Sequence, residues 1–179
     1  MALYKHVHNR SQLVDEMLDR LLDGISLVHT HGDWRQVVRA RVLAARAVLL
    51  EHTWLRDAIE SRPLATPRTL AHMDALMAAM FGGGLSADLV HHAMHALSTR
   101  MWGFSRDALP TPQVPDDPEE HARAMSEFAT TYPAIIRMVT NAPHAGAAYD
   151  DDAEFAFALD LILGGVEQLH ASGWRSTTS

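Results

Sequence analysis

The chain of 179 residues contains no cysteine and a single lysine, Lys5. Without cysteine, disulfides, thiolate metal ligands and cysteine nucleophiles are excluded. The apolar runs are too short for a bilayer-spanning helix, and the N-terminus lacks the apolar core of a signal peptide. β-branched residues are sparse and rarely alternate with polar ones, so strands are not expected. We therefore expect a soluble, cytoplasmic, helical protein without a membrane partner.

The charge is acidic overall and unevenly distributed. A formal net charge of −7 argues against a general nucleic-acid binder, because phosphate contacts need clustered cations. Residues 1–12 nevertheless carry Lys5 and Arg10 and no acid. A short basic start on an acidic body suits the end of a DNA-binding element attached to a regulatory body, although so short a segment does not decide this by its charge alone.

Caps and apolar periodicity divide the chain into about eight helices. Asp33 and Gln36 have the spacing of a capping box. Thr66 followed by Pro67 pairs an N-cap with proline at the first helical position. A last long helix is expected over residues 153–170. The fold class is therefore all-α, and a hydrophobic content of 47% is enough for a packed core.

A short motif stands at the start of the chain. Residues 3–7 read Leu-Tyr-Lys-His-Val, and Arg10 precedes a Leu-Val-Asp sequence at 13–15. This resembles the second half of the TetR-family headpiece, in which a recognition helix ends in Leu-Tyr-x-His-Val and a basic linker precedes Leu-Leu-Asp. The resemblance implies contacts to operator DNA, at phosphates or in the major groove. The residues that it assigns to DNA binding are Tyr4, Lys5, His6 and Arg10.

The body of the chain resembles the regulatory domain of the tetracycline-repressor branch of that family. The matching segments follow the family's order: Gly32-Asp33-Trp34-Arg35, Leu49–Leu55, Ser61-Arg62-Pro63, Gly84-Leu85-Ser86, Trp102-Gly103-Phe104 and Phe155–Gly165. The resemblance implies a TetR-like helical bundle that forms a homodimer through a four-helix interface. It also implies a ligand-responsive transcriptional regulator, expected to be a repressor, whose effector releases operator DNA.

The resemblance divides the chain into three parts. Residues 1–12 are expected to be the remnant of a helix-turn-helix headpiece, 13–171 a ligand-binding and dimerisation domain, and 172–179 a flexible tail. Roughly 40 residues of headpiece are expected before Met1, because a recognition helix cannot bury its inner face without its supporting helices. Two interpretations stay open: a regulator with a completed headpiece, and a headless ligand-binding dimer without autonomous DNA binding.

An apolar seam runs along the last expected helix. Its residues recur at spacings of 4, 3, 4 and 3: Phe155, Leu159, Ile162, Val166 and Leu169. In the family the last long helix pairs with the partner subunit, so this seam is expected to form the dimer interface. The alternative is the ordinary core helix of a monomer, which the spacing alone does not exclude.

An effector pocket is expected between the helices over 66–81 and 86–107. Methionine and aromatic side chains form adaptable apolar cavities, although methionines at helical spacing also fill ordinary cores. Tetracycline repressors hold a magnesium chelate with a histidine near the Arg-Pro pair, where this chain has Ala58. We therefore expect a different, small apolar or aromatic effector and no cofactor. The expected lining residues are Trp54, Met73, Met77, Met80, His95, Met101 and Trp102.

Metal and catalytic patterns are weak. His91 and His95 could share a metal across one helical turn, but no third ligand is near in sequence, and solvated histidines explain the pair better. Phosphate loops, nucleophile elbows and His-Glu-x-x-His patterns do not occur. The acids at 150–152 suit a hard cation, yet a helix N-terminal cluster explains them better. We therefore expect neither a metal site nor an enzyme.

Overall fold

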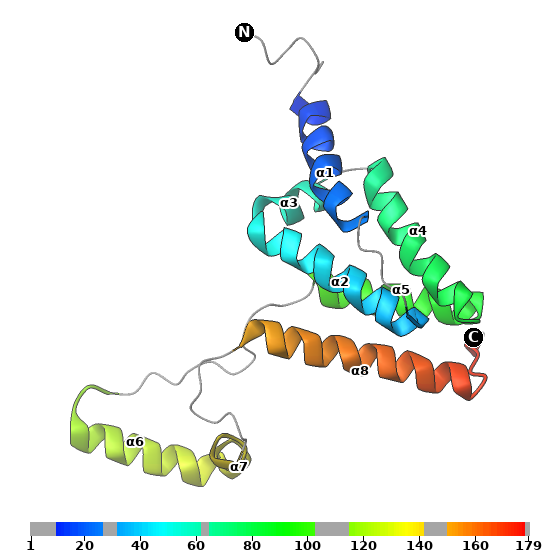
Figure 1. Ribbon diagram of the computed structural model, residues 1–179. Helices are drawn as coiled ribbons and strands as arrows, with labels where there is room; N and C mark the ends of the chain where they lie inside the picture. The colour runs from blue at the N-terminus through cyan, green and yellow to red at the C-terminus, as the bar shows by residue number, and fades with distance from the viewer. Residues whose placement is uncertain (1–9, 27–31, 62–64, 103–114, 142–149, 178–179) are drawn as a thin grey trace. The chain divides into compact units, whose positions relative to one another are not determined.

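The computed structural model describes residues 10–26, 32–61, 65–102, 115–141 and 150–177, and these form helices without any strand (Figure 1). The all-α fold expected from the sequence is therefore confirmed. The chain divides into two compact units, one with α1 to α5 and α8, the other with α6 and α7. The helices are α1 (Arg10–Ser26), α2 (Trp34–Glu51), α3 (Trp54–Glu60), α4 (Pro67–Gly82), α5 (Ala87–Trp102), α6 (Pro118–Thr131), α7 (Pro133–Asn141) and α8 (Asp151–Ala171).

Helix starts follow the side-chain caps that the sequence predicts. Asp33 accepts a hydrogen bond from the Gln36 amide at 2.9 Å, and the Gln36 side chain accepts one from the Asp33 amide at 3.2 Å. Thr66 caps α4, with proline at the first helical position. Asp117 caps α6 by accepting hydrogen bonds from two amides of its first turn. Each cap satisfies donors that have no partner inside the helix.

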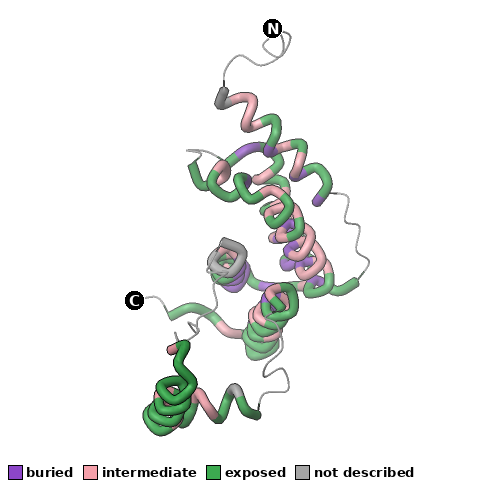
Figure 2. The backbone as a smooth tube through the Cα atoms, turned by 90° about the vertical axis from the view of Figure 1, so that its left-hand side faces the viewer, coloured by how far each residue is buried: buried purple, intermediate pink, exposed green. Residues whose placement is uncertain are grey.

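The larger of two apolar clusters in the first unit is built from four helices (Figure 2). Its fully buried members are each worth about 1.5–3 kcal/mol relative to an exposed position. The buried side chains come from α2, α4, α5, α8 and the connection between α4 and α5, which contributes Leu85: Trp34, Val38, Val42, Leu76, Met80, Leu85, Leu89, Val90, Ala93, Leu97, Phe155, Leu159, Leu163 and Val166. These contacts fix the four helices against one another.

The first helix is attached to α2 and α4 by a second apolar cluster and an ion pair. Leu22 and Ile25 of α1 pack on Ala45 of α2 in a second buried cluster. At the start of α4, the Arg68 guanidinium lies 2.8 Å from the Asp23 carboxylate of α1. α1 is thus joined to α2 by an apolar contact and to α4 by an ion pair.

The second unit is a bent helix pair. α6 ends at Thr131 with Tyr132 as its C-cap, and α7 begins at Pro133, whose ring is compatible with a first helical position. The rings of Phe128 and Tyr132 lie 4.9 Å apart between centroids. Within its described residues, 115–141, this unit buries no side chain fully. Among the described residues, none of the helices is long and apolar enough to cross a membrane.

Candidate functional site

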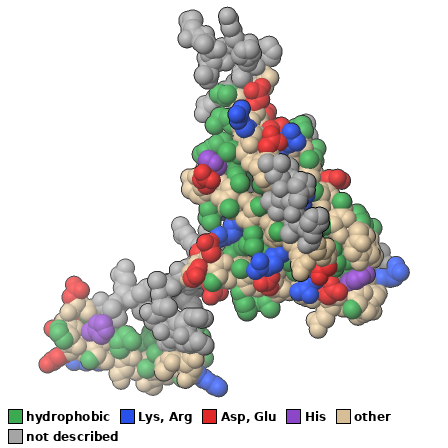
Figure 3. All heavy atoms as spheres, in the orientation of Figure 1, with side chains coloured by type: hydrophobic (Ala, Val, Ile, Leu, Met, Phe, Trp, Pro, Cys, Tyr) green, Lys and Arg blue, Asp and Glu red, His purple; other side chains and the backbone are tan. Residues whose placement is uncertain are grey.

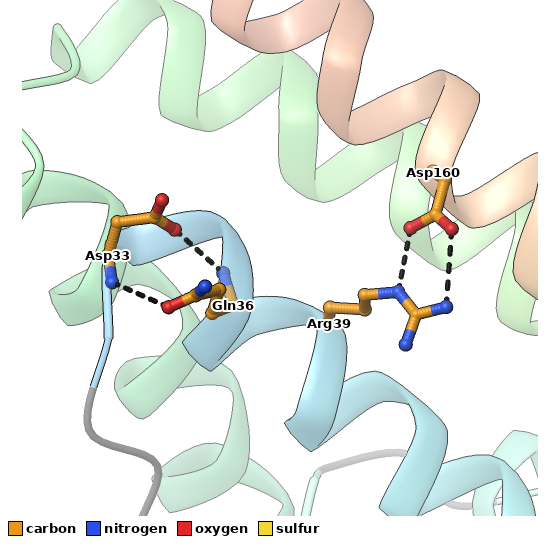
Figure 4. Close-up of polar contacts among 4 residues, drawn as sticks. All are labelled: Asp33, Gln36, Arg39 and Asp160. Atoms are coloured by element: carbon orange, nitrogen blue, oxygen red, sulfur yellow. Dashed lines mark hydrogen bonds and ion pairs between the residues drawn. The ribbon is translucent and has the colours of Figure 1, made fainter.

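α2 and α8 are joined by two polar contacts. The Arg39 guanidinium donates two hydrogen bonds to the Asp160 carboxylate, from Nε at 2.7 Å and from Nη2 at 3.2 Å (Figure 4). The second contact is at the N-terminal end of α2, where the indole N–H of Trp34 donates a hydrogen bond to the Glu167 carboxylate at 3.0 Å. The hydrogen bond from Arg39 lowers the pKa of Asp160 below its ordinary value. α2 therefore bridges the helices near the N-terminus and the last helix.

The three methionines of α4 that were predicted to line a pocket, Met73, Met77 and Met80, differ in how far they are buried. Met80 is fully buried in the core, and Met77 is half-buried against it. Met73 is 38% exposed. The three methionines do not share one environment, because α4 turns only part of its apolar surface toward α2 and α5. Met80 in particular serves core packing.

The other predicted effector residues are also spread out. Trp54, at the first position of α3, is exposed, and its ring contacts that of His52 at 6.5 Å between centroids. His95 is exposed on α5. Met101 and Trp102 end α5, and their side chains lie outside the described residues. The described residues of the predicted set therefore do not gather around one point.

Two half-buried polar side chains, Arg41 of α2 and His72 of α4, were not predicted from the sequence. Nε of Arg41 and both ring nitrogens of His72 are buried without a hydrogen-bond partner. Burial lowers the pKa of His72, and the charge of Arg41 lowers it further. The signal was present in the sequence: Arg41 follows Val38 by three positions and His72 precedes Leu76 by four, so helical periodicity turns both inward.

The face of α8 predicted to meet a partner subunit packs instead on its own chain. Phe155, Leu159 and Val166 are buried in the core, and Ile162 is half-buried against it. Leu169 is 37% exposed. The seam that the spacing revealed is thus the inner face of α8, because the described part of this chain already fills it.

A second apolar row lies on the outer face of α8. Phe157 and Leu161 are 62% and 61% exposed. A Cβ added to Gly164 or Gly165 would meet no atom within 4 Å, so the backbone is accessible there. This row is offset from the predicted seam by two residues, about half a helical turn.

The histidines of α5 form a surface stripe. The rings of His91 and His95 lie 4.6 Å apart between centroids in an edge-on arrangement. Nε2 of His92 lies 3.6 Å from Oδ1 of Asp88. All three histidines are exposed. A group of three or more potential metal-ligating side chains is not found among the described residues.

The segment after α8 packs on the start of α5. The Ser176 amide and hydroxyl donate to the two Asp88 carboxylate oxygens at 2.6 and 2.8 Å. Trp174 is half-buried against the core and meets the His92 ring edge-on at 5.4 Å. A pocket of about 210 Å³ lies here, bordered in part by His170. Residues 172–177 therefore differ from the flexible tail expected from composition.

The structure does not describe the side chains of the residues that were predicted to contact DNA. Tyr4, Lys5 and His6 lie outside the described residues, and Arg10 begins α1 with a side chain that is not described. On the face of the first unit shown in Figure 3, acidic and basic side chains are interspersed. That face carries no broad basic patch among its described residues.

Comparisons with known proteins agree with this architecture. A family model described as "Tetracyclin repressor-like, C-terminal domain" matches residues 29–170. An HTH-type transcriptional regulator of Saccharopolyspora erythraea is 32% identical over 103 residues, covering 57% of this chain and 44% of that protein. The HTH-type transcriptional repressor DrrR1 of Streptomyces coeruleorubidus is 26% identical over 184 residues, covering 96% of this chain and 66% of that protein. The chain thus spans less than two thirds of either relative, and both are regulators rather than enzymes.

A solved structure shares the fold. The Streptomyces coelicolor TetR family protein ActR, in complex with actinorhodin, superposes with a TM-score of 0.62. The match covers 93% of this chain and 80% of that one at 22% identity. At this identity the likeness is evidence for the helical arrangement alone.

Proposed function

Because this chain belongs to the tetracyclin repressor-like C-terminal domain family, we propose that it is the effector-binding and dimerising part of a ligand-responsive transcriptional repressor. The observation that carries the proposal is the family match over 29–170, which spans α2 to α7 and nearly all of α8. One curated relative is a repressor, and the structural relative ActR binds actinorhodin. Both support a regulator that responds to a small molecule.

The contacts of α1 provide a route from an effector to DNA. α1 leads toward the predicted DNA-binding residues, and it is tied to α4 through Arg68 and Asp23 and to α2 through Ala45. An effector that binds more tightly to one arrangement of α2 and α4 shifts the population toward that arrangement. α1 follows, and the two headpieces of a dimer then lose the spacing that operator DNA requires.

We assign the dimer interface to the outer face of α8 in place of the seam predicted from the sequence. Phe157 and Leu161 supply exposed apolar area, and Gly164 and Gly165 let another helix approach closely. A homodimer uses the same face twice, so one apolar row is sufficient for both subunits.

The interface is tested by replacing Leu161 with glutamate and measuring mass in solution by light scattering. We expect the wild type to be a dimer and Leu161→Glu a monomer at micromolar concentration, because two carboxylates would meet across the two-fold axis. Leu70→Glu is the matched control, since Leu70 is 55% exposed on α4. A dimer that survives Leu161→Glu would place the interface elsewhere.

Regulation is tested with DNA from upstream of the gene in a mobility-shift assay. The protein is assayed in a form that starts at Met1 and in a form whose reading frame is extended upstream of Met1. We expect the extended protein to retard the fragment and an effector to reverse the shift. Ligand binding without DNA binding by either form would favour the headless dimer instead.

A further inference from the structure

Two glycine turns lie close together where α4 and α8 end. Gly84, after α4, and Gly173, after α8, have positive φ angles of 83° and 66°. In each turn the residue after the glycine donates its amide to the carbonyl five residues earlier, Leu85 at 3.2 Å and Trp174 at 3.0 Å. This is the Schellman arrangement, in which the left-handed position favours glycine because a Cβ is strained there. Both turns therefore have a backbone path that local hydrogen bonds fix.

The two turns border one pocket of about 210 Å³, and Figure 1 shows the ends of α4 and α8 side by side there. Its apolar surface comes from Leu89, which is buried on α5, and from Trp174. Contacts with the core and with the His92 ring hold Trp174 in place. Sites for drug-sized ligands enclose about 300–1,000 Å³, whereas a cavity of about 150 Å³ holds benzene. The pocket therefore suits a ligand with one aromatic ring and a small substituent.

Two side chains at the pocket can donate hydrogen bonds to such a ligand. His170 is half-buried on the last turn of α8, and Nε2 of its ring lies 3.9 Å from the position of a Cβ added to Gly84. An imidazole has at least one N–H donor in either charge state. Arg175 is exposed and is a permanent cation with donors only. None of the described lining residues is acidic, so the pocket offers a positive charge and donors.

The acids that are closest in sequence to these residues already accept hydrogen bonds. Glu167 accepts the indole N–H of Trp34 at 3.0 Å. Asp88 accepts the amide and the hydroxyl of Ser176 at 2.6 and 2.8 Å. Among the described residues, by contrast, Arg175 has no ion-pair partner. A ligand with a carboxylate thus meets a guanidinium that is available to it.

We propose that this pocket, which we call the turn pocket, is a binding site for a carboxylate carried on a single aromatic ring. The ring lies against Trp174 and Leu89, because aromatic rings pair favourably in offset or edge-on arrangements. The carboxylate accepts charge-assisted hydrogen bonds from Arg175 and a further one from His170. The inference goes beyond the proposed function, since a ligand site at the turns stands whether or not the protein binds DNA.

Binding in the turn pocket is coupled to the segment after α8. That segment supplies Trp174 and Arg175, so the pocket is complete only while the segment is docked through Ser176 and Asp88. A ligand that binds only the docked form stabilises it by mass action. The protection of the Ser176 amide against hydrogen exchange should therefore increase when the pocket is filled.

The inference is tested by titrating the full chain with benzoate and following the amide resonances of Gly84 and Gly173 by NMR. We expect both to shift saturably, with a dissociation constant of about 1 mM or lower for so small a ligand. Benzamide lacks the charge and cyclohexanecarboxylate lacks the aromatic ring, so each should bind about threefold or more weakly. The inference is overturned if neither glycine responds saturably up to about 10 mM benzoate, or if benzamide binds as tightly as benzoate.

Variants then assign the binding to the turn pocket. Arg175→Gln should remove the preference for benzoate over benzamide, and Trp174→Leu the preference for benzoate over cyclohexanecarboxylate. Arg20→Gln is the matched control, because Arg20 is an exposed arginine on α1, and it should leave both preferences unchanged. Thermal unfolding of each variant establishes that it is folded, and replacing the exposed Arg175 leaves the core intact. Benzoate binding with both preferences intact in Arg175→Gln and Trp174→Leu would place the site elsewhere and overturn the assignment.

Discussion

The Arg39 guanidinium on α2 holds the Asp160 carboxylate on α8 by two parallel hydrogen bonds, with the donors on Nε and Nη2 of one arginine (Figure 4). Both side chains are close to half exposed. The pair therefore contributes more to the geometry between the two helices than to the free energy of unfolding, because solvent and salt screen it.

Removing this pair should have a small, salt-dependent effect. Arg39→Ala and Asp160→Ala should each lower the free energy of unfolding by about 0.2–1 kcal/mol. The folded-state pKa of Asp160 is lowered, so the stabilisation is present above the ordinary aspartate pKa and is lost as pH falls through the lower folded value. Urea unfolding of both single variants and the double variant, at low and high salt, measures the coupling. A coupling that high salt leaves unchanged would contradict this view.

Gly83 should not tolerate a side chain. A Cβ there would lie 2.7 Å from Cγ of Trp34, which is buried at the start of α2. Forcing a methyl group into this packed contact should cost about 1–3 kcal/mol. Gly82→Ala is the matched control, because its added Cβ meets no atom within 4 Å and alanine favours helix. Equal stability of the two variants in chemical unfolding would count against the close contact.

The segment after α8 should be released by acid. Hydrogen bonds from the Ser176 amide and hydroxyl lower the pKa of Asp88. Docking is therefore favoured above the ordinary aspartate pKa and weakens as pH falls through the lower folded value. The protection factor of the Ser176 amide, which is its intrinsic exchange rate at a given pH divided by the observed rate, should fall in that range, and Asp88→Asn should lower it already at pH 7. Protection of Ser176 that is unchanged in Asp88→Asn would argue against the contact.

His72 should make the fold sensitive to mild acid. Its folded-state pKa is lowered, so below the ordinary histidine pKa of about 6.5 the unfolded chain binds a proton that the folded chain resists. Stability should fall as pH drops from 7 to 5, and His72→Leu should remove this slope. Because His72→Leu also removes unsatisfied buried nitrogens, we expect it to raise stability at pH 7 by about 1–3 kcal/mol. Thermal unfolding across this pH range checks both expectations.

Local chemistry made much of the fold predictable. The capping box of Asp33 and Gln36 and the Thr66-Pro67 start depend on residues within one turn, so the sequence contains the whole interaction. Apolar spacing likewise identified α8 and its inner row. These features need no knowledge of distant parts of the chain.

Distant contacts account for what the sequence did not predict. α8 has two apolar rows, and periodicity cannot tell whether Leu159 or Leu161 is covered by the same chain. The polar end of the chain looked frayed because the partner of Ser176 is Asp88, far away in sequence. The burial of the Arg41 and His72 nitrogen atoms depends on the packing of α2 against α4, which the sequence does not reveal.

The inner row of α8 has a consequence for how subunits come together. Since Leu159 and Leu163 are buried within one chain, the apolar core of a protomer does not depend on a partner. The association that we propose through Phe157 and Leu161 is then a separate, concentration-dependent equilibrium. Protomers should therefore exchange between assembled pairs, and a variant that has lost its ligand response would enter mixed pairs with normal copies and impair them.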